Sequence, residues 1–476
     1  MPGTVTSMSR LTGNTRVGLA VLCTAQFVVV LDVTIVATAM PKIGADLGFA
    51  AAELSWVITA YTVVLAGLLI LGGRAADLAG ARRIFRAGLI TFSVASLACA
   101  LAWSPAVLIA ARGAQGVGAA LLSPAALAAL NELVQSEARR RALGWWTAAA
   151  AGGGASGWVL GGLITEYAGW RWVFAVNAPI GLAALILSHV LPPSTASTRL
   201  RVRRSRGMVA SLDLGGAVLV TVGIALGALG LSRISERVGS WAGWVAVGLS
   251  SAALAWFVRL ERRARQPLVP GSLLRAPGVL GGNLTAAALT GSTTPAMLMV
   301  VLYVQDTLGL PPARGALLFP AFNVAVICGS LLGPIGLIRW GIRPMLVGGF
   351  AAVVSGTGLL LMLPEEGLPT VLLLSAFALM GMGLGVASVA STTAGLIAVV
   401  QAERGVAAGL LNSTAQLGTA VGLAVVSPLA ATAAPMTGYR IGFVVAALIG
   451  VAGAASALSV PHHLPEPTDH PPQPTS

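Results

Sequence analysis

Long apolar stretches alternate with short polar segments along the whole chain. Fourteen of these stretches approach the length of about 20 residues that an α-helix needs to cross a bilayer, and they lie near 17–40, 54–73, 84–102, 106–130, 143–164, 172–191, 212–231, 241–258, 279–302, 315–338, 343–363, 369–395, 405–430 and 439–460. The two longest polar segments, 192–211 and 259–278, leave six stretches before them, two between them and six after them. The pattern therefore predicts an all-α integral membrane fold of two six-helix bundles plus a two-helix insert.

The same pattern divides the chain into parts. We expect residues 1–191 to form the N-terminal six-helix bundle, 192–278 a linker that contains the two-helix insert, and 279–460 the C-terminal six-helix bundle. Residues 461–476 are rich in proline and are expected to be a disordered tail. Two bundles of equal helix number suggest that the halves are repeats of one another.

Composition and charge support a membrane protein. The chain is 56% hydrophobic and only 9% charged, whereas a soluble domain carries about 25% charged residues. Its net charge of +13 comes from 28 arginines and one lysine, Lys42. A basic balance can indicate nucleic-acid binding, but these arginines gather in alternate loops, for example Arg139–Arg141 and Arg199–Arg206. This positive-inside bias predicts a multi-pass protein of the cell membrane, with both termini in the cytoplasm and no nucleic-acid partner.

Several kinds of chemistry are excluded by the residue inventory. A phosphate-binding loop needs lysine followed by serine or threonine, and Lys42 is followed by Ile43, so no ATP-driven motor is expected. The three cysteines are far apart, and the four histidines show no metal-site spacing. We therefore expect no metal, no cofactor and no enzymatic activity.

Two charged residues stand well inside apolar stretches. Asp32 lies nine residues before Pro41, and Arg112 lies seven residues after Pro105. At a rise of 1.5 Å per residue both fall roughly 10–13 Å from the same membrane face. A charge at this depth costs about 2.5–3.5 kcal/mol on insertion scales, so it is a candidate functional residue. A structural ion pair, or snorkelling of the side chains to an interface, is one reading. The other is a proton site, since burial disfavours the charged carboxylate and a nearby cation favours it.

A glycine- and arginine-containing segment follows the second apolar stretch. It reads Gly73-Arg74-Ala75-Ala76-Asp77-Leu78-Ala79-Gly80-Ala81-Arg82-Arg83, and its two glycines predict a tight turn between two helices. The segment resembles the signature loop of the major facilitator superfamily. The residues that match that loop are Gly73, Asp77, Gly80, Arg82 and Arg83, whereas Ala75, Leu78 and Ala81 depart from it. The resemblance implies that this loop gates the cytoplasmic side.

Further segments resemble motifs of the fourteen-span drug:proton antiporters in that superfamily. They are Leu31–Val36, Arg112–Ala120 with Gln115 and Gly116, and Gly169–Phe174 followed by Asn177–Gly181. The resemblance implies a role for Asp32 and Arg112 in proton coupling. A fourth match is the antiporter motif, carried by Gly153, Gly157, Gly161 and Gly162, in which Trp158 replaces the usual proline. Glycines four apart can also serve helix packing alone.

The second half carries fewer signals. Four polar side chains fall within its apolar stretches and either line a substrate cavity or bond between helices: Asn283, Asn323, Asn412 and Gln416. The resemblance implies a monomeric, proton-coupled antiporter that exports amphipathic drugs or antibiotics through the lipid bilayer by alternating access. Two alternatives are a metabolite importer or exchanger on the same fold, and a membrane sensor or assembly factor that transports nothing.

Overall fold

The computed structural model describes residues 13–50, 53–134, 137–192, 214–236, 239–263, 270–400, 403–431 and 434–460. The arginine cluster Arg199–Arg206 and the tail 461–476 lie outside the described residues. The described chain is helical, with these elements in the first half: α1 (Gly13–Leu47), α2 (Trp56–Ala79), α3 (Ala81–Ala100), α4 (Pro105–Leu133), α5 (Glu137–Tyr167), α6 (Arg171–Ala175), α7 (Asn177–Leu187) and η2 (Ser188–Val190).

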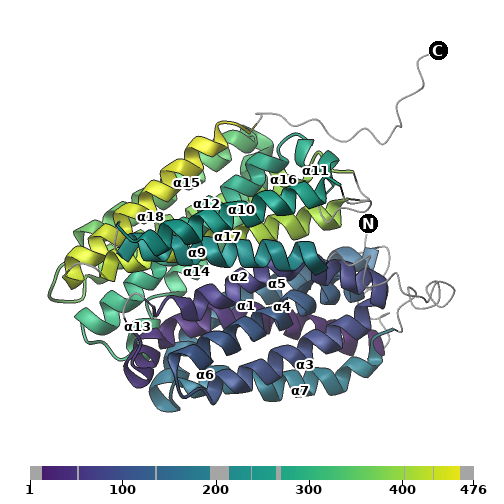
Figure 1. Ribbon diagram of the computed structural model, residues 1–476, viewed down its shortest axis with the longest axis horizontal. Coiled ribbons are helices and arrows are strands. Elements are labelled where there is room, and N and C mark those ends of the chain that lie inside the picture. Colours follow the sequence, from purple (N-terminus) through teal and green to yellow (C-terminus); the bar gives the residue numbers. More distant parts are fainter. Residues whose placement is uncertain are drawn as a thin grey trace, which may run out of the picture.

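Two helices follow as a pair, α9 (Leu214–Glu236) and α10 (Trp241–Glu261). The second half contains α11 (Gly271–Arg275), α12 (Val279–Leu302), η5 (Tyr303–Thr307), α13 (Pro312–Ala316), α14 (Pro320–Trp340), α15 (Ile342–Leu359), η6 (Leu360–Met362), α16 (Thr370–Leu396), α17 (Arg404–Ala431) and α18 (Pro435–Ala457). The helices α1–α7 lie together on one side of the molecule and α12–α18 on the other (Figure 1).

Thirteen helical segments in the described part of the chain are long and apolar enough to cross a membrane. The 31-residue α5 is not among them, because glycines and other weakly apolar residues interrupt its sequence. It nevertheless packs along α1 inside the N-terminal bundle. With α5 included, the described helices agree with the prediction of an all-α membrane fold of about fourteen long helices.

Helix boundaries differ from the sequence prediction at two informative places. Pro41 was expected to end the first span, but α1 continues through it to Leu47. The segment from Gly73 was expected to be a loop, but α2 continues to Ala79 because alanine and leucine are strong helix formers. Only Gly80 turns the chain there, with φ +97°, a conformation that a residue with a side chain rarely adopts.

Glycine lets helices approach closely in both halves. A Cβ atom on Gly72 of α2 would collide with the Ala120 carbonyl of α4, and one on Gly418 of α17 would collide with the Ala287 carbonyl of α12. These pairs show how small residues bring backbones together where lipid supplies no hydrophobic driving force.

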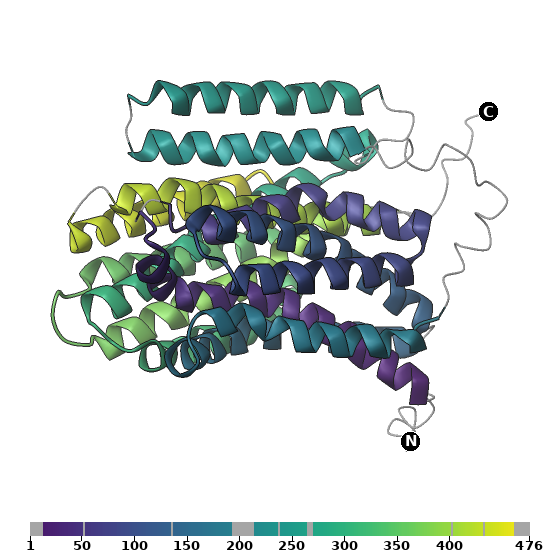
Figure 2. The ribbon, with the colours of Figure 1, turned by 60° about the horizontal axis from the view of Figure 1, so that its bottom comes forward.

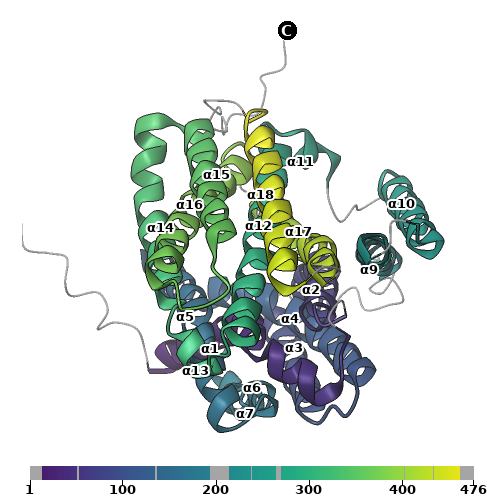
Figure 3. The same ribbon diagram turned by 90° about the vertical axis from the view of Figure 1, so that its left-hand side faces the viewer.

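The pair α9 and α10 stands beside the two bundles as a separate hairpin (Figures 2 and 3). Only α9 touches the rest of the molecule closely: it packs on α2 and α17, where Ile224 and Ala228 join a buried cluster with Val63 and Ala424. The outer helix α10 packs against α9 and exposes large apolar side chains such as Trp244 and Leu249. Such a surface is suited to lipid rather than to water.

The two halves meet through specific contacts at one end of the molecule. Gln305 Nε2 donates a hydrogen bond to the Thr38 carbonyl at 2.9 Å, and the Ala313 amide donates to Glu166 Oε2 at 2.8 Å. Deeper in the interface, Trp158 of α5 stacks on Phe319 before α14, with ring centroids 4.4 Å apart and planes 4° apart. The halves therefore lie closed against each other at the end where α1 and α12 end.

Candidate proton-coupling site

Asp32 and Arg112 form an ion pair inside the N-terminal bundle. Asp32 lies in the middle of α1 and Arg112 two turns into α4, and Arg112 Nη1 is 2.5 Å from Asp32 Oδ2. Both side chains have 0% exposure. The similar depth expected from the sequence is therefore matched by direct contact. Breaking such a buried pair by removing one partner costs about 3–5 kcal/mol, because the other charge is left uncompensated.

Neutral side chains complete a network around the carboxylate. Gln115 Nε2 donates to Asp32 Oδ1 at 2.7 Å and to Ser96 Oγ at 2.8 Å. Asn177 Nδ2 donates to the same Asp32 oxygen at 3.0 Å. The spacing of three residues between Arg112 and Gln115 places both on one face of α4, where Arg112 Nη1 also donates to Gln115 Oε1 at 2.6 Å. Residues of α4 and α7 thus bond directly to the carboxylate on α1, and Ser96 of α3 joins the network through Gln115.

The arginine is held from its other side by backbone and aromatic groups. Its Nε donates to the Val57 carbonyl at 2.8 Å, and its guanidinium carbon lies 4.4 Å from the ring centroid of Tyr61 and 5.7 Å from that of Phe174. Desolvated cation–π contacts of this kind are worth about 2 kcal/mol. Arg112 Nη2 and Asn177 Oδ1 are buried without a hydrogen-bond partner. The network therefore keeps spare donor and acceptor capacity.

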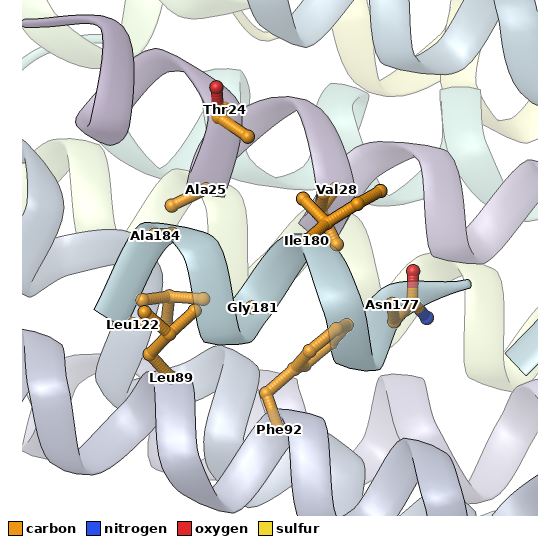
Figure 4. Close-up of a pocket in the computed structure, with 10 residues that line it drawn as sticks. All are labelled: Thr24, Ala25, Val28, Leu89, Phe92, Leu122, Asn177, Ile180, Gly181 and Ala184. Atoms are coloured by element: carbon orange, nitrogen blue, oxygen red, sulfur yellow. The ribbon is translucent and has the colours of Figure 1, made fainter. Parts of the chain in front are cut away.

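A small cavity borders the network on the α7 side. It has a volume of about 10 Å³, close to the minimum that admits one water molecule. Asn177 lies at one end of it, and the remaining lining residues that Figure 4 shows are almost all apolar, among them Val28, Leu89 and Phe92. The mostly apolar lining leaves Asn177 as the polar group nearest the carboxylate in this direction.

The antiporter-motif glycines of α5 face two different neighbours. Gly153, Gly157 and Gly161 lie against α1, where an added Cβ would collide with Phe27, Thr34 or Thr38. Gly162 faces the second half instead, against Pro312 and Ala316 of α13. Glycine therefore brings α5 close to the helix that carries Asp32 and also to the other bundle.

Trp158 occupies the place of the motif's proline. Its indole ring is 7% exposed and stacks on Phe319, which in turn contacts Phe377 at a centroid distance of 5.3 Å. The helix α5 is continuous through this position, from Glu137 to Tyr167. The substitution thus replaces a proline that would bend the helix with an aromatic contact between the halves.

The residues of the expected gating loop lie far from the network, along the end of α2 and the start of α3. Gly73 and Asp77 belong to α2, Gly80 makes the turn, and Arg82 and Arg83 belong to the first turn of α3. A Cβ on Gly73 would only touch Pro124 at 3.7 Å, so the backbone does not require glycine there. Gly116, by contrast, lies where α4 and α2 cross closely. A Cβ added to Gly116 would be only 2.7 Å from the Tyr61 carbonyl oxygen, so the crossing requires glycine there.

The four polar residues of the second half do not gather at one place. Asn283 Oδ1 accepts from Thr414 Oγ1 at 2.9 Å, which joins α12 to α17. Asn323 Nδ2 lies 3.5 Å from the Ala155 carbonyl of α5 and 3.3 Å from the Phe319 carbonyl. Asn412 is exposed and Gln416 is half-buried on α17. Helix-to-helix bonding describes the first two, and a cavity-lining role for the set stays a prediction.

Sequence reasoning placed Asn177 in a motif but did not include it in the site, and it missed Ser96 and Tyr61 entirely. An asparagine inside an apolar stretch is a detectable signal, since an unbonded amide is costly in lipid. Ser96 could not be found this way, because serines commonly bond to the carbonyl of the preceding turn, as Ser96 Oγ does to Phe92 at 2.8 Å.

Comparison with known proteins agrees with this architecture. A family model described as the Major Facilitator Superfamily matches residues 22–423, and the chain belongs to that family of membrane transporters. It is 38% identical to the cephamycin export protein CmcT of Amycolatopsis lactamdurans over 88% of this chain and 86% of that protein. It is 37% identical to the puromycin resistance protein pur8 of Streptomyces alboniger, over 88% of this chain and 82% of the relative.

Solved structures share the fold at low sequence identity. A peptide transporter, POT, gives a TM-score of 0.63 at 16% identity over 92% of this chain and 93% of its own. The inward-open xylose transporter XylE from E. coli gives 0.61 at 13% identity over 91% and 94%. These likenesses concern the fold alone. The family match and the helices described above make the protein a multi-pass membrane transporter of the major facilitator type.

Proposed function

We propose that the protein is a proton-coupled antiporter that exports amphipathic drugs or antibiotics from the cytoplasm by alternating access. The observation that carries the proposal is the fully buried network around Asp32. Asp32 and Arg112 are the only charged side chains that are buried in the described part of the chain, and buried charge in a membrane is retained mostly for function. The export and resistance proteins that resemble this chain support the outward direction of transport.

The geometry suits a carboxylate that gains and loses a proton. When Asp32 takes a proton it becomes neutral, and its attraction to Arg112 weakens. Arg112 keeps its bonds to the Val57 carbonyl and to Gln115 Oε1, so the cation stays solvated by the protein. Gln115 and Asn177 hold the carboxyl group in place in both states. Protonation can therefore change the contacts between α1 and α4 without leaving a bare charge in lipid.

The rest of the mechanism follows from the two-bundle fold. The halves would rock about a central site, with the segment Gly73–Arg83 latching the cytoplasmic side. A proton that moves down 100 mV releases about 2.3 kcal/mol, which corresponds to a roughly 50-fold gradient of a neutral substrate. One-for-one exchange with a monovalent cation would be electroneutral and would be driven by the pH difference alone. Both termini would then lie in the cytoplasm, and the protein would act in the cell membrane as a monomer.

The test is dye accumulation in inverted membrane vesicles that carry Asp32→Asn. Proton-driven accumulation of an amphipathic dye should fall to the background of empty vesicles, while imposed dye gradients still drive counterflow. Asp46→Asn is the matched control, because Asp46 lies on the same helix but is 48% exposed. Proton-driven accumulation that survives in Asp32→Asn would remove Asp32 from the coupling role.

A further inference from the structure

A second cavity lies between the halves, away from the Asp32 network. Its volume is about 250 Å³, just below the range of about 300–1,000 Å³ that small-molecule sites usually have. Met40 and the residues Leu54 and Ser55 form the wall from the first half, and α12, η5, α17 and α18 form the rest. Met40 is eight residues beyond Asp32 on α1, or roughly 12 Å closer to the end where α1 and α12 end.

Most of this cavity is apolar, but one side chain in its wall is charged. Leu298, Met299 and Leu302 contribute hydrocarbon and thioether surface, and Asp306 contributes a carboxylate. Within the described residues no arginine or lysine forms an ion pair with Asp306, whereas the carboxylate of Asp46 has such a partner. Asp306 sits in a π-helical turn, Tyr303–Thr307, that continues α12. Single π-turns are rare and frequently occur at functional sites.

Two hydroxyl groups add polar capacity to the same wall. Ser427 of α17 is 6% exposed, and its Oγ has no hydrogen-bond partner among the described residues. Native proteins rarely leave a buried hydroxyl without a partner, so Ser427 Oγ offers free hydrogen-bonding capacity to this cavity. Tyr439 of α18 also lines the cavity, and its ring lies nearly perpendicular to that of Tyr303, at a centroid distance of 6.1 Å. Tyr303 is itself fixed by a hydrogen bond to the Pro364 carbonyl at 2.8 Å.

We propose that this cavity binds a small amphipathic amine in its protonated form, with the ammonium on the Asp306 carboxylate and the apolar body against the methionine and leucine side chains. Asp306 is exposed at the edge of the apolar lining. A carboxylate beside an apolar wall favours a cation that brings its own hydrocarbon surface, because the charge and the hydrocarbon of such a ligand are then both satisfied. The Ser427 hydroxyl supplies a further acceptor for an ammonium hydrogen. The inference deepens the proposed export function by naming a substrate class and a place for it.

The site spans both halves, so its occupancy depends on how they meet. Met40, Leu54 and Ser55 belong to the first half, and Asp306, Ser427 and Tyr439 to the second. Rocking of the halves would separate these walls. A bound amine would therefore leave when the halves part at this end of the molecule.

The test is equilibrium binding to the full chain in lipid nanodiscs without any proton gradient. The probe is 3-phenylpropylamine, which is charged at neutral pH, and its neutral isostere is 3-phenyl-1-propanol, each corrected for partition into empty nanodiscs. The unmodified protein should bind the amine at least about tenfold more tightly than the alcohol, as a charge-assisted hydrogen bond predicts. Asp306→Asn should remove that preference and leave the affinity for the alcohol unchanged, whereas Asp306→Glu should keep it.

Two further variants locate the binding. Ala430→Leu fills the cavity and should weaken both probes about tenfold, whereas Glu366→Gln, an exposed carboxylate outside the cavity, should change neither. An amine preference that persists in Asp306→Asn would overturn the site, and so would unchanged binding in Ala430→Leu. Because binding is measured without a gradient, those results leave the vesicle experiment on Asp32 untouched. If vesicles of the unmodified protein showed no proton-driven transport but the Asp306-dependent preference for the amine were intact, the cavity would be supported and the proposed antiport would not.

Discussion

The two halves of the molecule use the same packing devices but differ in what they bury. The first half contains the charged pair Asp32 and Arg112 together with Gln115 and Asn177 at 0% exposure. In the described part of the second half, the buried polar side chains are hydroxyls and one amide, Asn283. Two bundles of one fold thus reach similar packing with and without charge.

In the second half, neutral side chains form the hydrogen bonds that join helices. Ser292 Oγ of α12 donates to the Ala446 carbonyl of α18 at 2.8 Å, and Thr414 of α17 donates to Asn283 of α12. Such bonds are worth about 0.6–2 kcal/mol in membranes. Since neutral bonds suffice to hold one half together, helix packing alone does not require the ion pair in the other half.

The largest expected effect comes from Arg112. Arg112→Met leaves the Asp32 carboxylate buried without its cation and should lower the free energy of unfolding by about 3–5 kcal/mol. The double variant Asp32→Asn with Arg112→Met removes both charges and should recover most of that stability, because neutral side chains already pack the second half. Thermal unfolding in detergent measures both, and proton-driven dye transport should be absent in both.

The double variant decides between the two readings of the pair. A stable double variant that does not transport assigns the charges to coupling. A double variant that transports normally would make the pair structural and erase the functional difference between the halves.

The next largest effects concern glycines that bring helices together in both halves. A Cβ at Gly153 would collide with the Phe27 carbonyl of α1, whereas at Gly154 the nearest atom is Val30 Cγ1 at 3.6 Å. In the second half, a Cβ added to Gly418 would lie 2.6 Å from the Cα atom of Ala287. A Cβ added to Gly409 would have no atom within 4 Å. Alanine at Gly153 or Gly418 should cost about 1–3 kcal/mol from overpacking.

Alanine at Gly154 or Gly409 should be neutral or slightly stabilising, because helix propensity favours alanine by about 1 kcal/mol. Thermal unfolding of the four single variants checks this. If all four behaved alike, backbone approach would not be what the glycines provide in either half.

The residues of these predictions also show how much of the structure can be predicted from the sequence. The apolar lengths and the loop charges predicted the membrane fold, and the positions of Asp32 and Arg112 predicted their similar depth, because bilayer thickness and helix rise set those quantities. Their direct contact was only one of the readings that the sequence left open. The contact of Trp158 with Phe319 could not be predicted from the sequence. It joins residues of different halves, and no local sequence pattern determines how the halves pack. The Asp306 cavity was missed because Asp306 lies just past the expected end of its span, where a charge costs little.

The Trp158–Phe319 stack is expected to give a smaller effect, and it links the halves rather than distinguishing them. A double-mutant cycle with Trp158→Leu and Phe319→Leu should show a coupling energy of about 0.5–1.5 kcal/mol in thermal unfolding. The same variants should increase the fraction of molecules whose halves are parted, measured as the distance between spin labels at residues 103 and 365, which are both exposed. If the stability losses of the two single variants were additive and the label distances unchanged, Trp158 would only fill space and would not hold the halves together.

The smallest effect is expected from a second ion pair in the first half. Comparing it with the Asp32–Arg112 pair tests whether burial causes the large effect of Arg112→Met. Asp46 accepts from Arg171 Nη1 at 2.6 Å and from Trp170 Nε1 at 2.9 Å, yet the two charged side chains are 48% and 47% exposed. Water solvates either charge when the other is removed, so Arg171→Gln should change stability far less than Arg112→Met does. The effect should shrink further in high salt, which screens exposed charges. Thermal unfolding at low and high salt measures it beside Arg112→Met. A loss as large as that of Arg112→Met would mean that short contact distance, and not burial, sets the strength of ion pairs in this half.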